Sequence, residues 1–140
     1  MSGFLLDTNV VSELIRPKPE RKVTAWVGGT DENLLYLSVL TLGEIRKGIG
    51  MVASQAQRVA LESWLDSELA VRFAGRILSI DDAVADRWGR LAANAMAAKL
   101  PLPVIDGLLA ATAVHHNLTL VTRNVKDVAG TGVPLFNPWA

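Results

Sequence analysis

The stretch Phe4-Leu5-Leu6-Asp7-Thr8-Asn9-Val10-Val11-Ser12-Glu13 decides how the rest of the chain is interpreted. Phe4-Leu5-Leu6 is a short apolar run typical of a buried strand, and Asp7 ends it. Asn9 is well suited to cap a short helix from Val10 to Ile15. A carboxylate therefore follows the first strand, and in open α/β sheets ligands bind beyond the carboxyl ends of the strands. Asp7 and Asn9 are also ordinary turn and cap residues, so a functional role depends on what the rest of the chain adds.

Composition limits the classes of protein that fit. The chain has 140 residues, half of them hydrophobic, which predicts a single domain spanning residues 1–140. There is no cysteine, which excludes a disulfide framework and a thiolate metal site. Formal net charge is zero, so a nucleic acid would have to be held by a local patch or through metal ions. No apolar stretch is long enough to span a membrane and no secretory signal is visible, so we expect a cytoplasmic protein without membrane contact.

Apolar runs and helical segments alternate along the chain. Runs with strand character follow the first one at Leu34–Leu37, Arg76–Ile80, Leu118–Thr122 and Val133–Phe136, and Pro134 favours the sheet edge for the last. Helices are predicted from Pro19 through Val27, after Ser38 or Thr41 to Met51, over Ser54–Leu69, from the cap Asp81-Asp82, and from Val104 to His115-His116. This alternation predicts an α/β fold, a parallel sheet with helices on both faces.

Glu44 has two interpretations. Thr41-Leu42-Gly43-Glu44 matches a capping box, in which Glu44 would fold back onto the amide of Thr41. Ser38 is an equally good cap one turn earlier. If Ser38 caps the helix, Glu44 projects from it and is available for chemistry.

Asp106 also has two interpretations. It stands in the first turn of an apolar helix, where the helix dipole stabilises a carboxylate by under ~1 kcal/mol. Its neighbours Ile105, Leu108 and Leu109 are all apolar, and a carboxylate close to a core face needs a cation.

The predicted topology brings polar residues to one edge of the sheet. Asp7, Thr122, Asn124 and Asp127 follow strands directly, and Glu44 and Asp106 lie on helices that begin near the same edge. Oxygen ligands without histidine or cysteine suit a hard cation such as Mg²⁺ or Mn²⁺. Such a site can polarise a phosphate and activate water for in-line attack, which predicts phosphodiester hydrolysis.

Four ordered motifs carry a resemblance to a known family. They are Leu5-Leu6-Asp7-Thr8-Asn9, Gly43-Glu44-Ile45-Arg46-Lys47-Gly48, Asp106 before Leu109-Ala110-Ala111-Thr112-Ala113, and Val121-Thr122-Arg123-Asn124. Together they resemble the PIN domain, and within it the VapC/FitB-like toxins of toxin–antitoxin pairs. Phe73-Ala74-Gly75-Arg76-Ile77-Leu78 and Phe136-Asn137-Pro138-Trp139 are similar to the FitB-like branch.

The resemblance implies a Mg²⁺- or Mn²⁺-dependent endoribonuclease that a small VapB/FitA-like antitoxin inhibits by inserting its tail into the active site. Asp7, Glu44 and Asp106 would be the metal-binding acids, and Thr8 or Thr122 would shape the site. The partners it implies are the antitoxin, an RNA substrate, and operator DNA through the antitoxin only. We also expect a homodimer, alone or within a higher assembly with the antitoxin, because a mean hydropathy of +0.28 predicts large apolar patches.

One position departs from the family pattern. Many relatives have a fourth acid directly after Thr-Arg, where this chain has Asn124. Either Asn124, which brings no charge, or Asp127, three residues later, would fill that position, so one or two metal ions are compatible with the sequence. A PIN-like module that binds RNA or protein without cutting is the alternative function. A HAD-like phosphate hydrolase would need a second acid where Asn9 stands.

Overall fold

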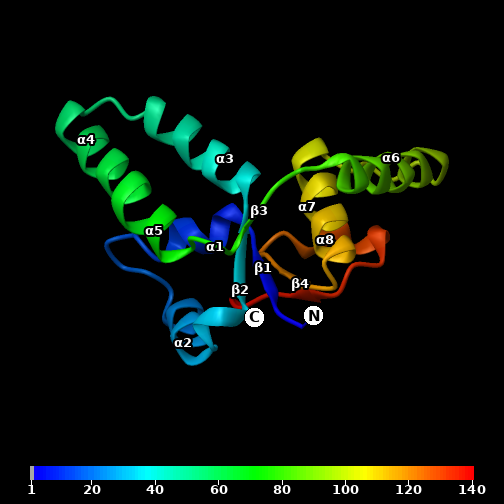
Figure 1. The fold of residues 1–140 in the computed structure, drawn as a ribbon, viewed down its shortest axis with the longest axis horizontal. Coiled ribbons are helices and arrows are strands. Elements are labelled where there is room, and N and C mark those ends of the chain that lie inside the picture. The colour runs from blue at the N-terminus through cyan, green and yellow to red at the C-terminus, as the bar shows by residue number, and fades with distance from the viewer. Residues whose placement is uncertain (1) are drawn as a thin grey trace.

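The computed structural model describes residues 2–140, and within them five parallel strands form one sheet (Figure 1). In spatial order the strands are β3 (Ile77–Leu78), β2 (Leu35–Ser38), β1 (Phe4–Leu6), β4 (Thr119–Val121) and β5 (Leu135–Phe136). The predicted parallel α/β fold is confirmed, and β5 lies at an edge as Pro134 predicts. Because β1 is central and all pairs are parallel, Asp7 lies in the middle of the carboxyl edge.

Helices fill the connections between the strands. They are α1 (Thr8–Glu13), α2 (Arg21–Gly29), α3 (Val39–Gly50), α4 (Gln55–Ser63), α5 (Ala70–Arg72), α6 (Asp82–Ala97), α7 (Val104–His115) and α8 (Val125–Val128). Short 3-10 turns occupy Glu32–Leu34 and Ala129–Thr131, and a π-helical segment over Trp64–Leu69 joins α4 to α5. The helix expected over Ser54–Leu69 therefore continues, with this π-helical segment, to Arg72. Within residues 2–140, no helix has the length and apolar content needed to cross a lipid bilayer.

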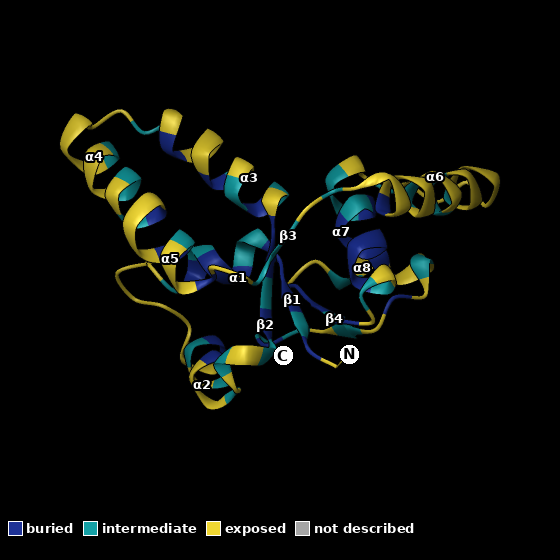
Figure 2. Cartoon of the chain, in the orientation of Figure 1, coloured by how far each residue is buried: buried dark blue, intermediate teal, exposed yellow. Residues whose placement is uncertain are grey.

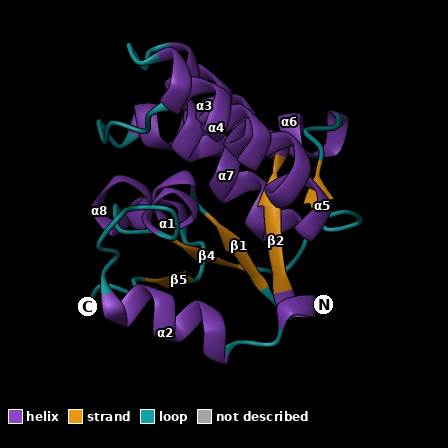
Figure 3. Ribbon diagram, turned by 90° about the vertical axis from the view of Figure 1, so that its left-hand side faces the viewer, coloured by secondary structure: helices purple, strands orange, loops and turns teal. Residues whose placement is uncertain are grey.

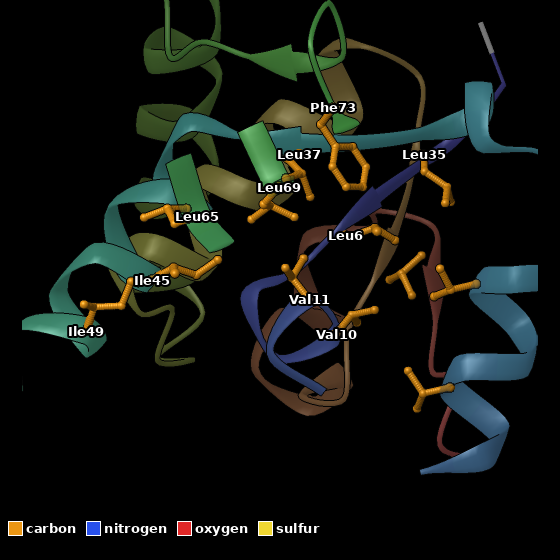
Figure 4. Close-up of a cluster of buried hydrophobic side chains, with 13 residues drawn as sticks. Leu6, Val10, Val11, Leu35, Leu37, Ile45, Ile49, Leu65, Leu69 and Phe73 are labelled. Atoms are coloured by element: carbon orange, nitrogen blue, oxygen red, sulfur yellow. The ribbon is translucent and has the colours of Figure 1, made fainter. Parts of the chain in front are cut away.

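Helices cover both faces of the sheet. Because alternate residues of β1 point to opposite sides, Leu5 and Leu6 each pack against a different helical layer. Leu6 packs with side chains of α1, α2, α3 and the π-helical segment, and Figure 4 draws the buried side chains of this cluster. Leu5 packs with α7, α8 and the start of β4 on the other face. Both leucines are fully buried. The sheet is therefore held between two apolar layers, and its carboxyl edge is fixed relative to both.

Two helical arms extend beyond the sheet. In Figure 1, α3 and α4 form a hairpin on one side and α6 projects on the other. Figure 2 shows that α7, between α6 and the sheet, is largely buried while α6 is mostly exposed. Glu44 lies on α3 and Asp106 lies in the first turn of α7, and both helices begin near the carboxyl edge of the sheet.

Three local predictions are wrong. Helix α1 begins at Thr8, and Asp7 caps it in place of Asn9, because the Asp7 carboxylate accepts from the Thr8 amide. Helix α2 begins at Arg21 with Glu20 as its cap, later than Pro19 predicts. Strand β3 is shorter than expected; Arg76 directs its guanidinium to main-chain carbonyls of other segments.

Ser38 caps α3, as one of the two alternatives for this helix predicts. Its hydroxyl accepts a hydrogen bond from the Leu40 amide at 3.0 Å. The capping-box interpretation is wrong, because the Thr41 hydroxyl is buried without a hydrogen-bond partner within the described residues. Glu44 is therefore not used to cap its own helix.

Substitution of the two hydroxyl residues tests this assignment. We expect Ser38→Ala to lower the free energy of unfolding by about 1 kcal/mol, because a helix cap is lost. Thr41→Val should leave stability unchanged or raise it, because it removes a buried hydroxyl that lacks a partner. Urea denaturation of both variants measures the difference, and a larger loss for Thr41→Val than for Ser38→Ala would restore the capping box.

Candidate active site

Asp7 is the central residue of the candidate site. It follows β1, its side chain is only 7% exposed, and both carboxylate oxygens accept hydrogen bonds. Oδ1 accepts from the Thr8 amide at 2.7 Å, and Oδ2 accepts from the Thr122 hydroxyl at 2.8 Å. Burial raises the pKa of Asp7, the bonds from Thr122 and Thr8 lower it in part, and the charge of Glu44 raises it again. The carboxylate is fixed in direction and poorly solvated.

Asn9 supports Asp7 across the same junction. Its Nδ2 donates weakly to Thr122 Oγ1 at 3.4 Å and to Asp7 Oδ2 at 3.5 Å. Its Oδ1 is buried and accepts no hydrogen bond within residues 2–140. Sequence reasoning gave Asn9 a capping role and missed this one, because Thr122 lies 113 positions away and no local signal pairs them.

Glu44 reaches the site from α3. Its Oε1 accepts a hydrogen bond from the Thr8 hydroxyl at 2.6 Å, which ties α3 to the start of α1. One carboxylate oxygen is thus occupied by the protein, and the side chain is half-buried. Thr8 orients Glu44 in the way that Thr122 orients Asp7.

Asp106 lies in the first turn of α7 and is half-buried. Its carboxylate accepts no hydrogen bond within the described residues. Burial, followed by the negative charges of Asp7, Asp127 and Glu44, raises the pKa of Asp106 to about 6. These contributions place Asp7, Asp127 and Glu44 close enough to Asp106 for their charges to act on it.

Asn124 and Asp127 are the two candidates for the fourth position of the site, which follows Thr122 and Arg123. Asn124 donates its main-chain N–H to Thr122 Oγ1 at 3.0 Å, and its side chain caps nothing. Asp127 is exposed in α8, and its amide donates to the Asn124 carbonyl at 3.1 Å. Of the two, Asp127 supplies the negative charge that acts on Asp106.

We call Asp7, Glu44, Asp106 and Asp127 the acidic cluster. None of its members forms an ion pair within residues 2–140, whereas Glu13, Glu32, Asp66 and Asp86 each pair with an arginine. Partly buried carboxylates that repel one another without a cation are unfavourable for the fold. Their arrangement is a feature of sites that receive a cation from outside the chain.

A divalent ion fits the donors of this site if it keeps several of its water ligands. Within residues 2–140, no three acidic or histidine side chains are grouped closely enough to hold a metal ion among them. Mg²⁺ keeps several waters and needs only one or two carboxylates, so a hydrated ion is compatible with the spacing. The buried Oδ1 of Asn9, which lacks a partner, adds an acceptor beside Asp7 for such a hydrated ion.

Comparison with models of protein families matches residues 4–127 to the PIN domain. The chain belongs to the PIN domain family. Toxin FitB of Neisseria gonorrhoeae is 36% identical over 136 residues, which are 97% of this chain and 98% of that protein. VapC ribonuclease Y4jK of Sinorhizobium fredii is 34% identical over 136 residues, 97% of each chain. The crystal structure of FitAcB from Neisseria gonorrhoeae superposes with a TM-score of 0.94 at 36% identity, covering 97% of this chain and 98% of that one.

The predicted resemblance to VapC/FitB-like toxins is confirmed over almost the whole PIN domain. The match with the family extends from Phe4 to Asp127 and so includes every member of the acidic cluster. The roles of the individual acids and of a metal ion are separate questions, which the geometry above addresses.

The raised pKa of Asp106 predicts a pH-dependent stability of the metal-free PIN domain. The pKa of Asp106 is ordinarily 3.8 and rises to about 6 in the folded chain. Between pH 3.8 and about 6, the folded chain therefore holds a proton that the unfolded chain has lost. The free energy of unfolding should therefore fall as pH rises from about 4 to about 6, and stay lower above that. After allowance for solvent around a half-exposed group, we expect Asp106→Asn to be more stable by about 1 kcal/mol at pH 7.5.

Urea denaturation in EDTA at pH 4.5 and pH 7.5 measures this difference. Glu68→Gln is the matched control, because Glu68 is an exposed carboxylate of the π-helical segment, outside the acidic cluster. A stability gain in Asp106→Asn that is equal at both pH values, or equal to that of Glu68→Gln, would contradict the electrostatic interpretation.

Proposed function

We propose that this chain is a metal-dependent endoribonuclease toxin of a toxin–antitoxin pair, with Mg²⁺ as the cofactor and Mn²⁺ as a substitute. The observation that carries the proposal is the acidic cluster, which is partly buried and has no cation of its own within residues 2–140. The names of relatives support it, since one is a toxin and another a VapC ribonuclease, each matched over 97% of this chain.

Each acid has a distinct part in this proposal. Asp7 would bind the ion directly, because two hydrogen bonds fix its direction. Asp106 would be the second direct ligand, since no hydrogen bond within the described residues competes for its oxygens. Glu44, with one oxygen held by Thr8, and the exposed Asp127 would bind through water. Asn124 would place Thr122 through its main chain.

The bound ion would supply charge stabilisation and an activated water for in-line attack on the phosphodiester. The chain itself positions the ligands, and the bonds from Thr122 and Thr8 offset part of the rise that burial causes in the pKa of Asp7. No histidine lies in the cluster, so the proton of the attacking water would leave through carboxylates or solvent.

Substitution of Asp7 tests the metal site and the reaction together. Asp7→Asn keeps a good helix cap at this position, so α1 should remain folded. We expect isothermal calorimetry to show Mn²⁺ binding largely lost, and RNA cleavage to fall by about a hundredfold or more, because the ion contributes several kcal/mol to charge stabilisation. Wild-type cleavage should stop in EDTA and leave 5′-phosphate and 3′-hydroxyl ends.

Glu68→Gln serves as the control for both measurements. Unchanged Mn²⁺ binding in Asp7→Asn would remove Asp7 from the metal site. Activity in EDTA, or a 2′,3′-cyclic phosphate product, would contradict the metal-dependent mechanism. A chain that binds RNA and Mn²⁺ but never cuts would support the alternative, a PIN-like binding module.

The antitoxin is the second part of the proposal. A cognate VapB/FitA-like antitoxin would bring an arginine to the acidic cluster, because bidentate Arg–carboxylate pairing is strong in a poorly solvated site. We also place a homodimer in the proposal, since apolar side chains around the end of α6 are exposed, with Met96 81%, Val104 59% and Leu100 54% accessible.

Competition measures the antitoxin's effect. Addition of the purified antitoxin tail should weaken Mn²⁺ binding and RNA cleavage together, because Mn²⁺ and the arginine of the tail need the same carboxylates. Asp106→Asn should weaken the affinity for the tail about tenfold, as expected for loss of one charge-assisted pair. Light scattering of the same samples reports the dimer. A chain that stays monomeric at high concentration, and whose cleavage no co-encoded partner inhibits, would be a free-standing PIN nuclease.

A further inference from the structure

Arg123 is an exposed cation at the carboxyl end of β4, the same edge of the sheet as the acidic cluster. It lies between Thr122, whose hydroxyl donates to Asp7, and Asn124, whose amide donates back to Thr122. Both neighbours of Arg123 are therefore tied to the site by hydrogen bonds of 2.8 and 3.0 Å. Yet Arg123 forms no ion pair within residues 2–140.

The side chain of Arg123 lies against the ring of Trp139. The guanidinium carbon of Arg123 lies 5.2 Å from the centroid of the Trp139 ring, within the range of a cation–π contact. The Trp139 amide donates to Asn137 Oδ1 at 2.9 Å, and its ring packs against the apolar cluster of the α1–α2 face. Because residues 137–140 leave the carboxyl end of β5, this ring lies at the same edge of the sheet as the acids. Figure 3 shows α1, α8 and the C-terminal end on one side of the molecule.

This contact has a consequence for the charges at the site. Arg123 directly follows Thr122, yet it pairs with none of the four carboxylates, and its charge is not among the causes that shift the pKa of Asp7 or Asp106. The Arg123 guanidinium lies over the Trp139 ring instead, and within the described residues the acidic cluster and Arg123 both remain unpaired. The Arg123 guanidinium donates no hydrogen bond within the described residues, so its planar N–H groups are available to bind a phosphate in a bidentate manner.

We propose that Arg123, held on the ring of Trp139, binds a backbone phosphate of single-stranded RNA and positions the strand against the acidic cluster. This inference rests on the proposed function. With zero net charge, the chain has no overall field to hold RNA, and the cluster itself repels phosphate. A local cation held at the same edge of the sheet would supply the missing attraction. Trp139 is the positioning residue, and Arg123 is the group that touches the substrate.

Fluorescence anisotropy with a short labelled oligouridylate tests the proposal over a series of KCl concentrations. Each variant is made in the full chain carrying Asp106→Asn, so that the probe survives. We expect Arg123→Gln to lower affinity about tenfold. It should reduce the slope of log K against log salt by about 0.7, the value for one phosphate contact on a single strand. Arg123→Lys should keep the slope and recover only part of the affinity, because lysine lacks the planar fork.

Trp139 and a distant arginine complete the set of variants. Trp139→Leu should lose most of the affinity that Arg123 contributes, and Trp139→Phe, which keeps an aromatic face, should retain it. The matched control is Arg87→Gln on α6. Arg87 lines a cavity with His115. His115 lies nine residues after Asp106 on α7, which is about 14 Å along the helix axis. It should change neither affinity nor slope.

The outcomes separate this inference from the proposed function. Unchanged affinity and slope in Arg123→Gln, or an equal loss in Arg87→Gln, would overturn the role of Arg123. In the chain with Asp106 intact, Arg123→Gln should raise KM more than it lowers kcat, and cleavage with an unchanged KM would overturn this role alone. RNA that binds through Arg123 but is never cut with Mn²⁺ would overturn the nuclease alone. A chain that binds no RNA would overturn both.

Discussion

The hydrogen bond from Thr122 to Asp7 is the constraint on which the rest of the site depends. It joins residues 115 positions apart, and the pairing of β1 with β4 makes it possible. Leu6 pairs with Val121, and the Asp7 amide donates to the Val121 carbonyl at 2.9 Å, so the ladder runs up to the site itself. A slip of one residue would reverse the faces of β4 and direct the Thr122 side chain away from Asp7. Core packing on both faces of β1 therefore also specifies the direction of a carboxylate.

The same packing allows the fold to carry charges that repel. Asp7 is the more buried acid, but two hydrogen bonds to its carboxylate offset part of the cost of removing it from water. Asp106 is less buried and accepts no hydrogen bond within the described residues, and its pKa rises to about 6. The two acids thus differ in kind. Hydrogen bonds fix the direction of the Asp7 carboxylate, whereas no hydrogen bond within the described residues restrains Asp106, which is open to any cation that approaches.

Much of this arrangement follows from sequence, and the exceptions share one physical cause. The apolar runs at β1, β2 and β4 predict a parallel sheet, and the sheet predicts that Asp7, Glu44 and Asp106 meet at one edge. The bond from Thr122 to Asp7 and the interactions of Asn9 could not be predicted, because they depend on Thr122 at the far end of the chain.

The cation–π pair of Arg123 and Trp139 is a second exception of this kind. It forms only because β4 and β5 end at the same edge of the sheet. Periodicity and local capping rules describe neighbours in sequence, whereas the details of this site are contacts between distant segments.

A coupling between protons and cations follows from the charge of the acidic cluster. Near pH 6 Asp106 is partly protonated, so a cation that binds there must displace a proton, and its affinity rises with pH until Asp106 is fully ionised. This applies equally to a divalent ion and to an arginine of an antitoxin, the two cations of the proposed function. Their competition should therefore depend little on pH, although each affinity does. Arg123 stands outside this coupling, because its guanidinium lies over the Trp139 ring and pairs with none of these acids within the described residues.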